Sequence, residues 1–138
     1  MNNLENLKRQ HTEIFELMNE TTKMIAQKDL ESNGQNIAKN ISSLAGKLKM
    51  HLGNEDKFMY PSFLMSKNEE LKKKATEYID EMGDLSSVYM TFKDKYNTRT
   101  KILNDQAGFM KESAVVFKAI EKRIKKEDSD LYVIAAKL

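Results

Sequence analysis

The sequence contains no cysteine, which excludes disulfide bonds, thiolate metal ligands and cysteine nucleophiles. It has five glycines and one proline among 138 residues, too few for sheets that are joined by tight turns. Leucine, isoleucine, lysine, glutamate, methionine and alanine are abundant instead, and most of these residues favour helices. The composition therefore predicts an all-α protein, and the length is that of one domain, residues 1–138.

The chain also lacks a strong charge imbalance and a long apolar run. Its 23 basic and 21 acidic residues leave a net charge of +2, and no basic face with spaced aromatic residues appears. Nucleic acid is therefore not expected as a partner. The N-terminal segment is polar, and no apolar run approaches the roughly 20 residues that span a bilayer. We expect a cytoplasmic protein without a membrane partner, either a monomer or a weak homodimer.

Apolar residues recur every three or four positions, as in helices that bury one face. The pattern predicts four helices: residues 3–28, 34–65, the stripe at 71–96, and a last helix that begins after a cap at Asp105 and reaches Leu131. Polar residues 29–34 and a linker at 97–104 separate them. Pro61 should kink or interrupt the second helix, and Gly83 would lie inside the third. Four such helices predict an antiparallel up-and-down four-helix bundle.

The sequence has two histidines, and both occupy central positions of apolar stripes on consecutive helices. One histidine on an apolar face is more often a hydrogen-bonded core residue than a ligand. Antiparallel neighbours, however, can bring His11 and His51 to the same depth of the core. Glu55 follows His51 by four residues, so the two side chains lie on the same helical face. An unpaired carboxylate in a core costs several kcal/mol, and a metal ion is one of few adequate partners.

Three further glutamates lie on or beside buried stripes. Glu127, between Ile124 and Leu131, is the most convincing. Glu81 and Glu112 have a similar position on the third and fourth helices, although Glu81 also fits an ordinary flanking residue. The metal-ligand hypothesis thus comprises a set of inward-facing side chains: His11, His51, Glu55, Glu81, Glu112 and Glu127.

Arg123 precedes Glu127 by four residues, just as His51 precedes Glu55. A guanidinium has no lone pair for a metal, so an inward Arg123 would pair with a carboxylate. The alternative is an arginine that extends from the edge of the bundle into solvent. Tyr60, Tyr89 and Tyr132 are candidate phenols near the site, whereas the nine methionines are most simply core residues.

The segments that carry these residues resemble the hemerythrin-like (HHE cation-binding) proteins of bacteria. They are LKRQHTEIFELM, KLKMHLGNEDKFMYPSFL, YIDEMGDLSSVY, GFMKES and EKRIKKEDSDLY, and they span nearly the whole chain. The block from His51 through Glu55 and Asp56 to Tyr60 and Pro61 is the most specific part. The resemblance implies a four-helix bundle that holds a carboxylate-bridged pair of irons.

The resemblance carries His11, His51 and Glu55 over as ligands, and Glu127 as the second bridging acid. Oxygen-carrying hemerythrins also have histidines on helices three and four, which are missing here, and Arg123 replaces the one on helix four. Glu81 and Glu112 are the proposed substitutes. Two imidazoles and four carboxylates would balance two divalent cations, and this donor set suits Fe, or alternatively Mn.

Anionic oxygen ligands favour ferric over ferrous iron, which disfavours reversible oxygen carriage. We therefore expect a di-iron protein that reacts with or senses O2 or peroxide, or handles iron; an oxidase or peroxide-consuming activity would fit. Two alternatives stay open. One is a reversible O2-binding or storage protein. The other is a metal-free bundle that serves as a protein-interaction or regulatory module.

Overall fold

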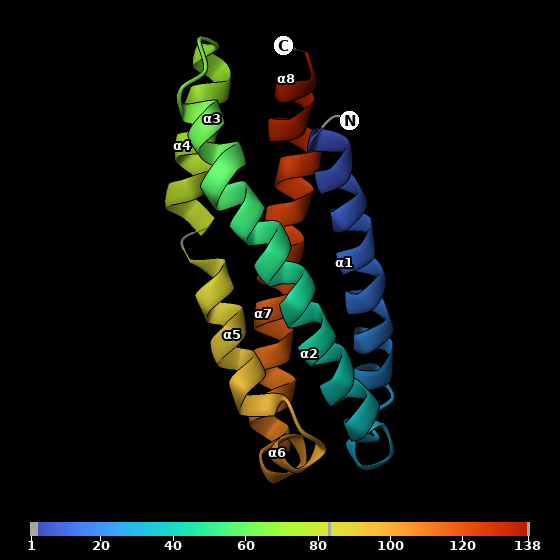
Figure 1. Ribbon diagram of the computed structural model, residues 1–138. Coiled ribbons are helices and arrows are strands. Elements are labelled where there is room, and N and C mark those ends of the chain that lie inside the picture. Colours follow the sequence, from blue (N-terminus) through green and yellow to red (C-terminus); the bar gives the residue numbers. More distant parts are fainter. Residues whose placement is uncertain (1–2, 83, 138) are drawn as a thin grey trace.

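A computed structural model describes residues 3–82 and 84–137, and their helices form an antiparallel up-and-down bundle of four rods (Figure 1). The all-α prediction is confirmed. The helical segments, with η for a π-helical turn, are α1 (Asn3–Ala26), α2 (Leu30–Asn54), η1 (Glu55–Met59), α3 (Tyr60–Leu64), α4 (Glu69–Met82), α5 (Leu85–Tyr96), α6 (Arg99–Asn104), α7 (Gln106–Lys126), η2 (Glu127–Leu131) and α8 (Tyr132–Ala136).

The rods are α1, then α2–η1–α3, then α4 followed by α5, and finally α7–η2–α8. The short helix α6 lies at the end of the bundle opposite the beginning of α1 and the end of α8 (Figure 1). Each long rod thus runs antiparallel to the next along the chain. This arrangement brings the middles of α1, α2–η1 and α7–η2 to the same depth, where the polar side chains of the core meet.

Aspartates begin three of the helices. Asp29, Asp84 and Asp105 each accept a hydrogen bond of 3.1 Å from the backbone N–H three residues later, which satisfies a donor that has no helical partner. The predicted cap at Asp105 is confirmed. Because Asp29 caps α2, residues 30–34 are helical, where the sequence predicted a turn. The turn itself lies at Lys28, whose φ of 57° ends α1.

The second and third rods differ from the predicted helices in how they are interrupted. Helical structure continues through Pro61, because the wider π-helical turn η1 comes just before it and changes the hydrogen-bond pattern there. The third rod is divided: α4 ends at Met82 and α5 begins after the cap at Asp84. Gly83, which the sequence placed inside one continuous helix, lies outside the described residues.

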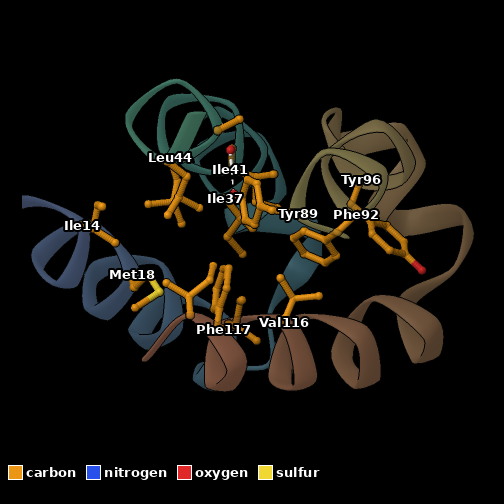
Figure 2. Packing of buried hydrophobic residues seen from close by; sticks show 14 of the residues in the cluster. Ile14, Met18, Ile37, Ile41, Leu44, Tyr89, Phe92, Tyr96, Val116 and Phe117 are labelled. Carbon is orange, nitrogen blue, oxygen red and sulfur yellow. Dashed lines mark hydrogen bonds between the residues drawn. The ribbon is translucent and has the colours of Figure 1, made fainter. Parts of the chain in front are cut away.

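Buried apolar side chains form two clusters along the bundle. The larger cluster packs α1, α2, α5 and α7 together, and Figure 2 shows part of it, including Ile14, Ile41, Tyr89 and Phe117. Each fully buried leucine or isoleucine stabilises the fold by about 1.5–3 kcal/mol relative to an exposed one. The smaller cluster joins the beginning of α1, at Leu7, to α3, α4 and α8.

A layer of buried polar side chains separates the two clusters. Along α1, His11 lies between Leu7 of the smaller cluster and Ile14 of the larger one. The same layer contains buried residues of the second and fourth rods: His51, Glu55, Arg123 and Glu127. Within residues 3–82 and 84–137, no helix has the length and apolar character needed to cross a membrane.

Candidate metal centre

Four of the predicted ligands meet in this polar layer. His11 comes from α1, His51 from α2, Glu55 from the first residue of η1 and Glu127 from the first residue of η2. One donor atom from each lies within 4.8 Å of the others, and all four residues are at most 2% exposed. Donors around one ion lie up to about 4.4 Å apart when each metal–ligand bond is about 2.0–2.2 Å. The cluster therefore has nearly the size of a single coordination sphere.

His51 presents a bare nitrogen to the centre of the cluster. Its Nδ1 lies 2.6 Å from Oε1 of Gln10, an amide oxygen that can only accept, so Nδ1–H is the donor. Burial, followed by the charge of His11, lowers the pKa of His51 to about 3, which keeps the imidazole neutral. Its Nε2 lone pair has no hydrogen-bond partner among the described residues and faces Oε1 of Glu55 at 3.3 Å.

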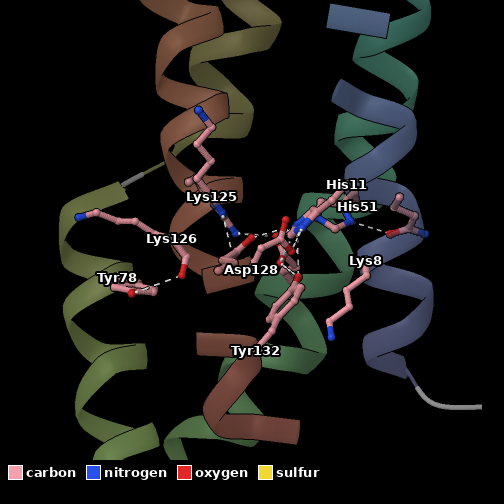
Figure 3. Close-up of polar contacts among 12 residues, drawn as sticks. Lys8, His11, His51, Tyr78, Lys125, Lys126, Asp128 and Tyr132 are labelled. Carbon is pink, nitrogen blue, oxygen red and sulfur yellow. Dashed lines mark hydrogen bonds and ion pairs between the residues drawn. The ribbon is translucent and has the colours of Figure 1, made fainter. Parts of the chain in front are cut away.

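His11 has the same orientation, with a carboxylate behind it. Its Nδ1 donates to Oδ1 of Asp128 at 2.7 Å, and its ring stacks on Tyr132 with centroids 5.2 Å apart (Figure 3). Its Nε2 lies 3.2 Å from Oε1 of Glu127 and 3.9 Å from Oε2 of Glu55. Burial lowers the pKa of His11, but Asp128 and Glu127 outweigh this and raise it to about 9. Without a metal, His11 therefore carries a proton and a positive charge at neutral pH.

The two glutamates are held by tyrosines from each other's rod. Tyr132 donates to Oε2 of Glu55 at 2.5 Å, and Tyr60 donates to Oε2 of Glu127 at 2.6 Å. Burial, reinforced by these carboxylates, raises the pKa of both phenols, so they stay protonated. Burial, followed by the charge of Glu55, also raises the pKa of Glu127.

Among the described residues, Nε2 of His51 and Oε1 of Glu127 form no hydrogen bond, although Nε2 of the charged His11 lies 3.2 Å from this Glu127 oxygen. Leaving such an atom unpaired in a core costs about 1–3 kcal/mol. Both atoms carry a lone pair, so a proton donor from water or a cation is the chemistry that would satisfy them. A metal ion between them would satisfy both at once, and the donor set of imidazole and carboxylate fits such an ion.

Arg123 lies on the other side of the same carboxylates. Its Nη2 contacts Oε1 of Glu55 and Oδ1 of Asp56, each at 3.2 Å, and its Nε lies 3.4 Å from Oε2 of Glu127. The guanidinium also covers the Tyr60 ring at 5.5 Å from the centroid. The side chain is 3% exposed. The prediction that Arg123 pairs with carboxylates is confirmed, and its extension into solvent is excluded.

The structure does not bring Glu81 and Glu112 to the cluster. Glu81 is exposed and binds Lys126 at 2.6 Å and Lys122 at 3.0 Å, and hydrogen bonds from these lysines lower its pKa. Glu112 binds Lys95 at 2.9 Å and lies fifteen residues before Glu127, about 22 Å along the helix axis at about 1.5 Å per residue. Both positions lie beside a buried stripe and not in its middle, and both carboxylates pair with lysines.

The sequence-based prediction did not identify two residues that support the site, and it placed one tyrosine near the site that lies elsewhere. Gln10 and Asp128, which hold the histidines, were not recognised. Asp128 could have been found, because it follows Glu127 just as Asp56 follows Glu55. Of the three candidate phenols, Tyr60 and Tyr132 reach the site, whereas Tyr89 donates to the carbonyl of Ile41 in the larger apolar cluster.

A pocket of about 510 Å³ leads from the surface to the arginine side of the layer. It lies between α3 and α4, and its lining includes Tyr60, Tyr78 and Arg123. Tyr78 is held in place by a 2.6 Å hydrogen bond to Asp130. A small molecule in this pocket would contact the guanidinium and the phenol that hold Glu127.

The sequence was also compared with known proteins. The model of the hemerythrin HHE cation-binding domain matches residues 2–135. No curated protein and no solved structure matches the chain. The match covers nearly the whole chain, including all four residues of the buried cluster.

Proposed function

Because this chain belongs to the hemerythrin HHE cation-binding family, we propose that it is a non-haem iron protein that reacts with or senses O2 or peroxide, or that handles iron. The observation that carries the proposal is the buried Nε2 of His51, which has no hydrogen-bond partner among the described residues and faces a carboxylate oxygen at 3.3 Å. A cation at this place would convert a repulsive contact into two bonds. Iron is the first expectation and manganese the second, since the donors are imidazole and carboxylate.

The chain's own residues would hold the ion in a fixed geometry. Asp128 and Gln10 bind the Nδ1 atoms of His11 and His51, so both Nε2 atoms are directed to the same point. Glu55 and Glu127 would each supply an oxygen, while Tyr132 and Tyr60 hold the other oxygen of each. The bound ion would supply Lewis acidity and, as iron, a redox couple.

Reaction with O2 or peroxide is favoured over reversible carriage by the surroundings of the site. Half of the proposed ligands are carboxylates, which favour the ferric state. The pocket between α3 and α4 gives a small molecule access to the guanidinium of Arg123, a hydrogen-bond donor beside the carboxylates. An oxidase or peroxide-consuming enzyme would use this donor to orient an oxygen species, and a sensor would transmit its binding to the helices.

A second candidate, a metal-free interaction module, has one observation in its favour. Arg123 and a protonated His11 place two positive charges against the two buried carboxylates, so the charges of the core balance when no metal is bound.

Several properties stay predictions from the composition: a cytoplasmic location, the lack of nucleic-acid and membrane partners, and a monomeric or weakly dimeric state.

Metal analysis of protein purified without chelators tests the proposal. We expect bound iron or manganese in the wild-type protein and loss of most of it in His51→Ala. Met50→Ala, a change at the exposed neighbouring residue, is the control and should retain the metal. Unchanged metal content in His51→Ala would refute the site, and wild-type protein that holds no metal would favour the interaction module. A fully reversible absorption change on oxygenation would instead indicate an O2 carrier.

A further inference from the structure

We infer that the core of this chain holds a single metal ion, and that the guanidinium of Arg123 takes the place of a second ion between the same two carboxylates. The inference rests on the proposed function and concerns the number of ions, not whether metal binds. It differs from the pair of irons that the family resemblance implies. Four observations support it.

The first observation is a repeat in the sequence that the structure places around one centre. Residues 51–60 and 123–132 share a pattern: a basic residue, a glutamate four positions later, an aspartate next to it, and a tyrosine five positions after the glutamate. In both segments the glutamate begins a π-helical turn. The basic residue is a histidine in one segment and an arginine in the other, so the two sides of the centre differ in their chemistry.

The second observation concerns the histidine side, which is open to a cation. Within residues 3–82 and 84–137, the Nε2 atom of His51 and Oε1 of Glu127 have no hydrogen-bond partner. The Nε2 atom of His11 lies 3.2 Å from this Glu127 oxygen. One donor atom from each of His11, His51, Glu55 and Glu127 lies within 4.8 Å of the others. One ion would occupy the space between them.

The third observation concerns the arginine side, where donors already occupy the carboxylate oxygens. Oε2 of Glu127 accepts from Tyr60 at 2.6 Å and faces Nε of Arg123 at 3.4 Å. Nη2 of Arg123 lies 3.2 Å from Oε1 of Glu55, the oxygen that His51 also faces, so the guanidinium and an ion on the histidine side would share this oxygen. A guanidinium is permanently charged and has no lone pair, so it cannot ligate an ion. The guanidinium and the first ion would already be two cations at these buried carboxylates, so a second ion would add a third, and charge repulsion is strong there.

The fourth observation is that, among the residues that the structure describes, the third rod adds none to the group of possible metal ligands. Glu81 is engaged with two lysines at the surface, and Tyr78 donates to Asp130. In the part of the chain that the structure describes, the four residues of the centre are the one group of histidine, aspartate and glutamate side chains that is suitably placed for a metal. A second ion would therefore have only the shared carboxylates, with Arg123 between them.

The test is the number of ions per chain after anaerobic loading with excess Fe(II), followed by desalting, metal analysis and protein quantification. Wild-type protein is expected to retain about one ion, because the two histidines and two carboxylates form one ligand set. Arg123→His removes the guanidinium and adds a nitrogen donor, so retention should rise to about two ions per chain. Lys118→His adds a histidine at an exposed position of the same helix and should stay at the wild-type value.

Each outcome separates the inference from the proposed function. Two ions in the wild-type protein would overturn the inference and leave the proposed function standing. No ion in the wild-type protein would overturn the proposed function and the inference with it. Arg123→His with a single ion would show that the guanidinium does not take the place of the second.

If circular dichroism shows that Arg123→His does not fold, the number of ions is tested instead with the electron paramagnetic resonance spectrum of the Mn(II)-loaded wild-type protein. An isolated ion gives a resolved hyperfine pattern, which is the expected result. The spectrum of a magnetically coupled pair would overturn the inference.

Discussion

The segments 51–60 and 123–132 are built on the same pattern and yet do opposite things in the core. In the first, His51 leaves an unpaired lone pair directed at Glu55. In the second, Arg123 provides donors to Glu55, Asp56 and Glu127. One side of the polar layer thus offers an imidazole lone pair, whereas the other side holds a permanent positive charge. A single exchange of a basic residue changes what a repeated segment can bind, while the helical geometry stays the same.

The largest effect is expected from removing the guanidinium of Arg123. Arg123→Met should lower the free energy of unfolding of the metal-free protein by about 3–5 kcal/mol, because Glu55 and Glu127 would lose their fixed buried counter-charge. Urea denaturation after treatment with a chelator measures this. Lys118→Met, on the exposed face of α7, is the control for the loss of a positive charge. A loss no larger than that of the control would mean that the buried pairs do not stabilise the layer.

A smaller effect is expected on the histidine side of the polar layer, where Asp128 orients His11. Asp128→Asn should weaken metal affinity by about 10–100-fold, since a partner that fixes a ligating histidine typically contributes that much. Competition with a chromophoric chelator would measure the affinity. Asp130→Asn is a matched control, because Asp130 lies two residues away and binds Tyr78 and Lys74 instead. Equal losses in the two variants would refute the role of Asp128.

The smallest effect is expected from the glutamates outside the polar layer. Glu81→Gln and Glu112→Gln should leave metal content and affinity unchanged, because both carboxylates bind surface lysines. The same metal analysis checks this, with Glu55→Gln as the variant that should lose metal. A loss of metal in Glu81→Gln or Glu112→Gln would restore the larger ligand set that the helical stripes indicate.

Much of the fold was predictable because it depends on local patterns. The stripes of apolar residues identified the rods, and the aspartate at position 105 was recognised as a cap. The start of α2 at Leu30 and the continuation of helical structure through Pro61 were not predicted. A short polar segment fits either a turn or a capped first helical turn. A proline is tolerated after a π-helical turn. The division of the third rod before Asp84 had no clear signal beyond Gly83.

The centre was predictable only in part, because a stripe tells which way a side chain faces within its own helix. That information was sufficient for His11, His51, Glu55 and Glu127, which lie in the middle of their stripes. It was insufficient for Glu81 and Glu112, which flank theirs. A flanking position does not fix whether the carboxylate faces the core or the surface, and here both carboxylates pair with lysines of a neighbouring rod.

The sequence by itself determined that this chain is a helical bundle of the HHE family, with His11, His51, Glu55 and Glu127 in the middle of stripes that face its core. Only the tertiary structure decided how the four rods meet at that depth. Tyr60 binds Glu127 across 67 residues, Tyr132 binds Glu55 across 77, and Arg123 reaches Glu55 across 68. Such pairings depend on the relative depth and rotation of whole rods, and the period of one helix carries no information about either.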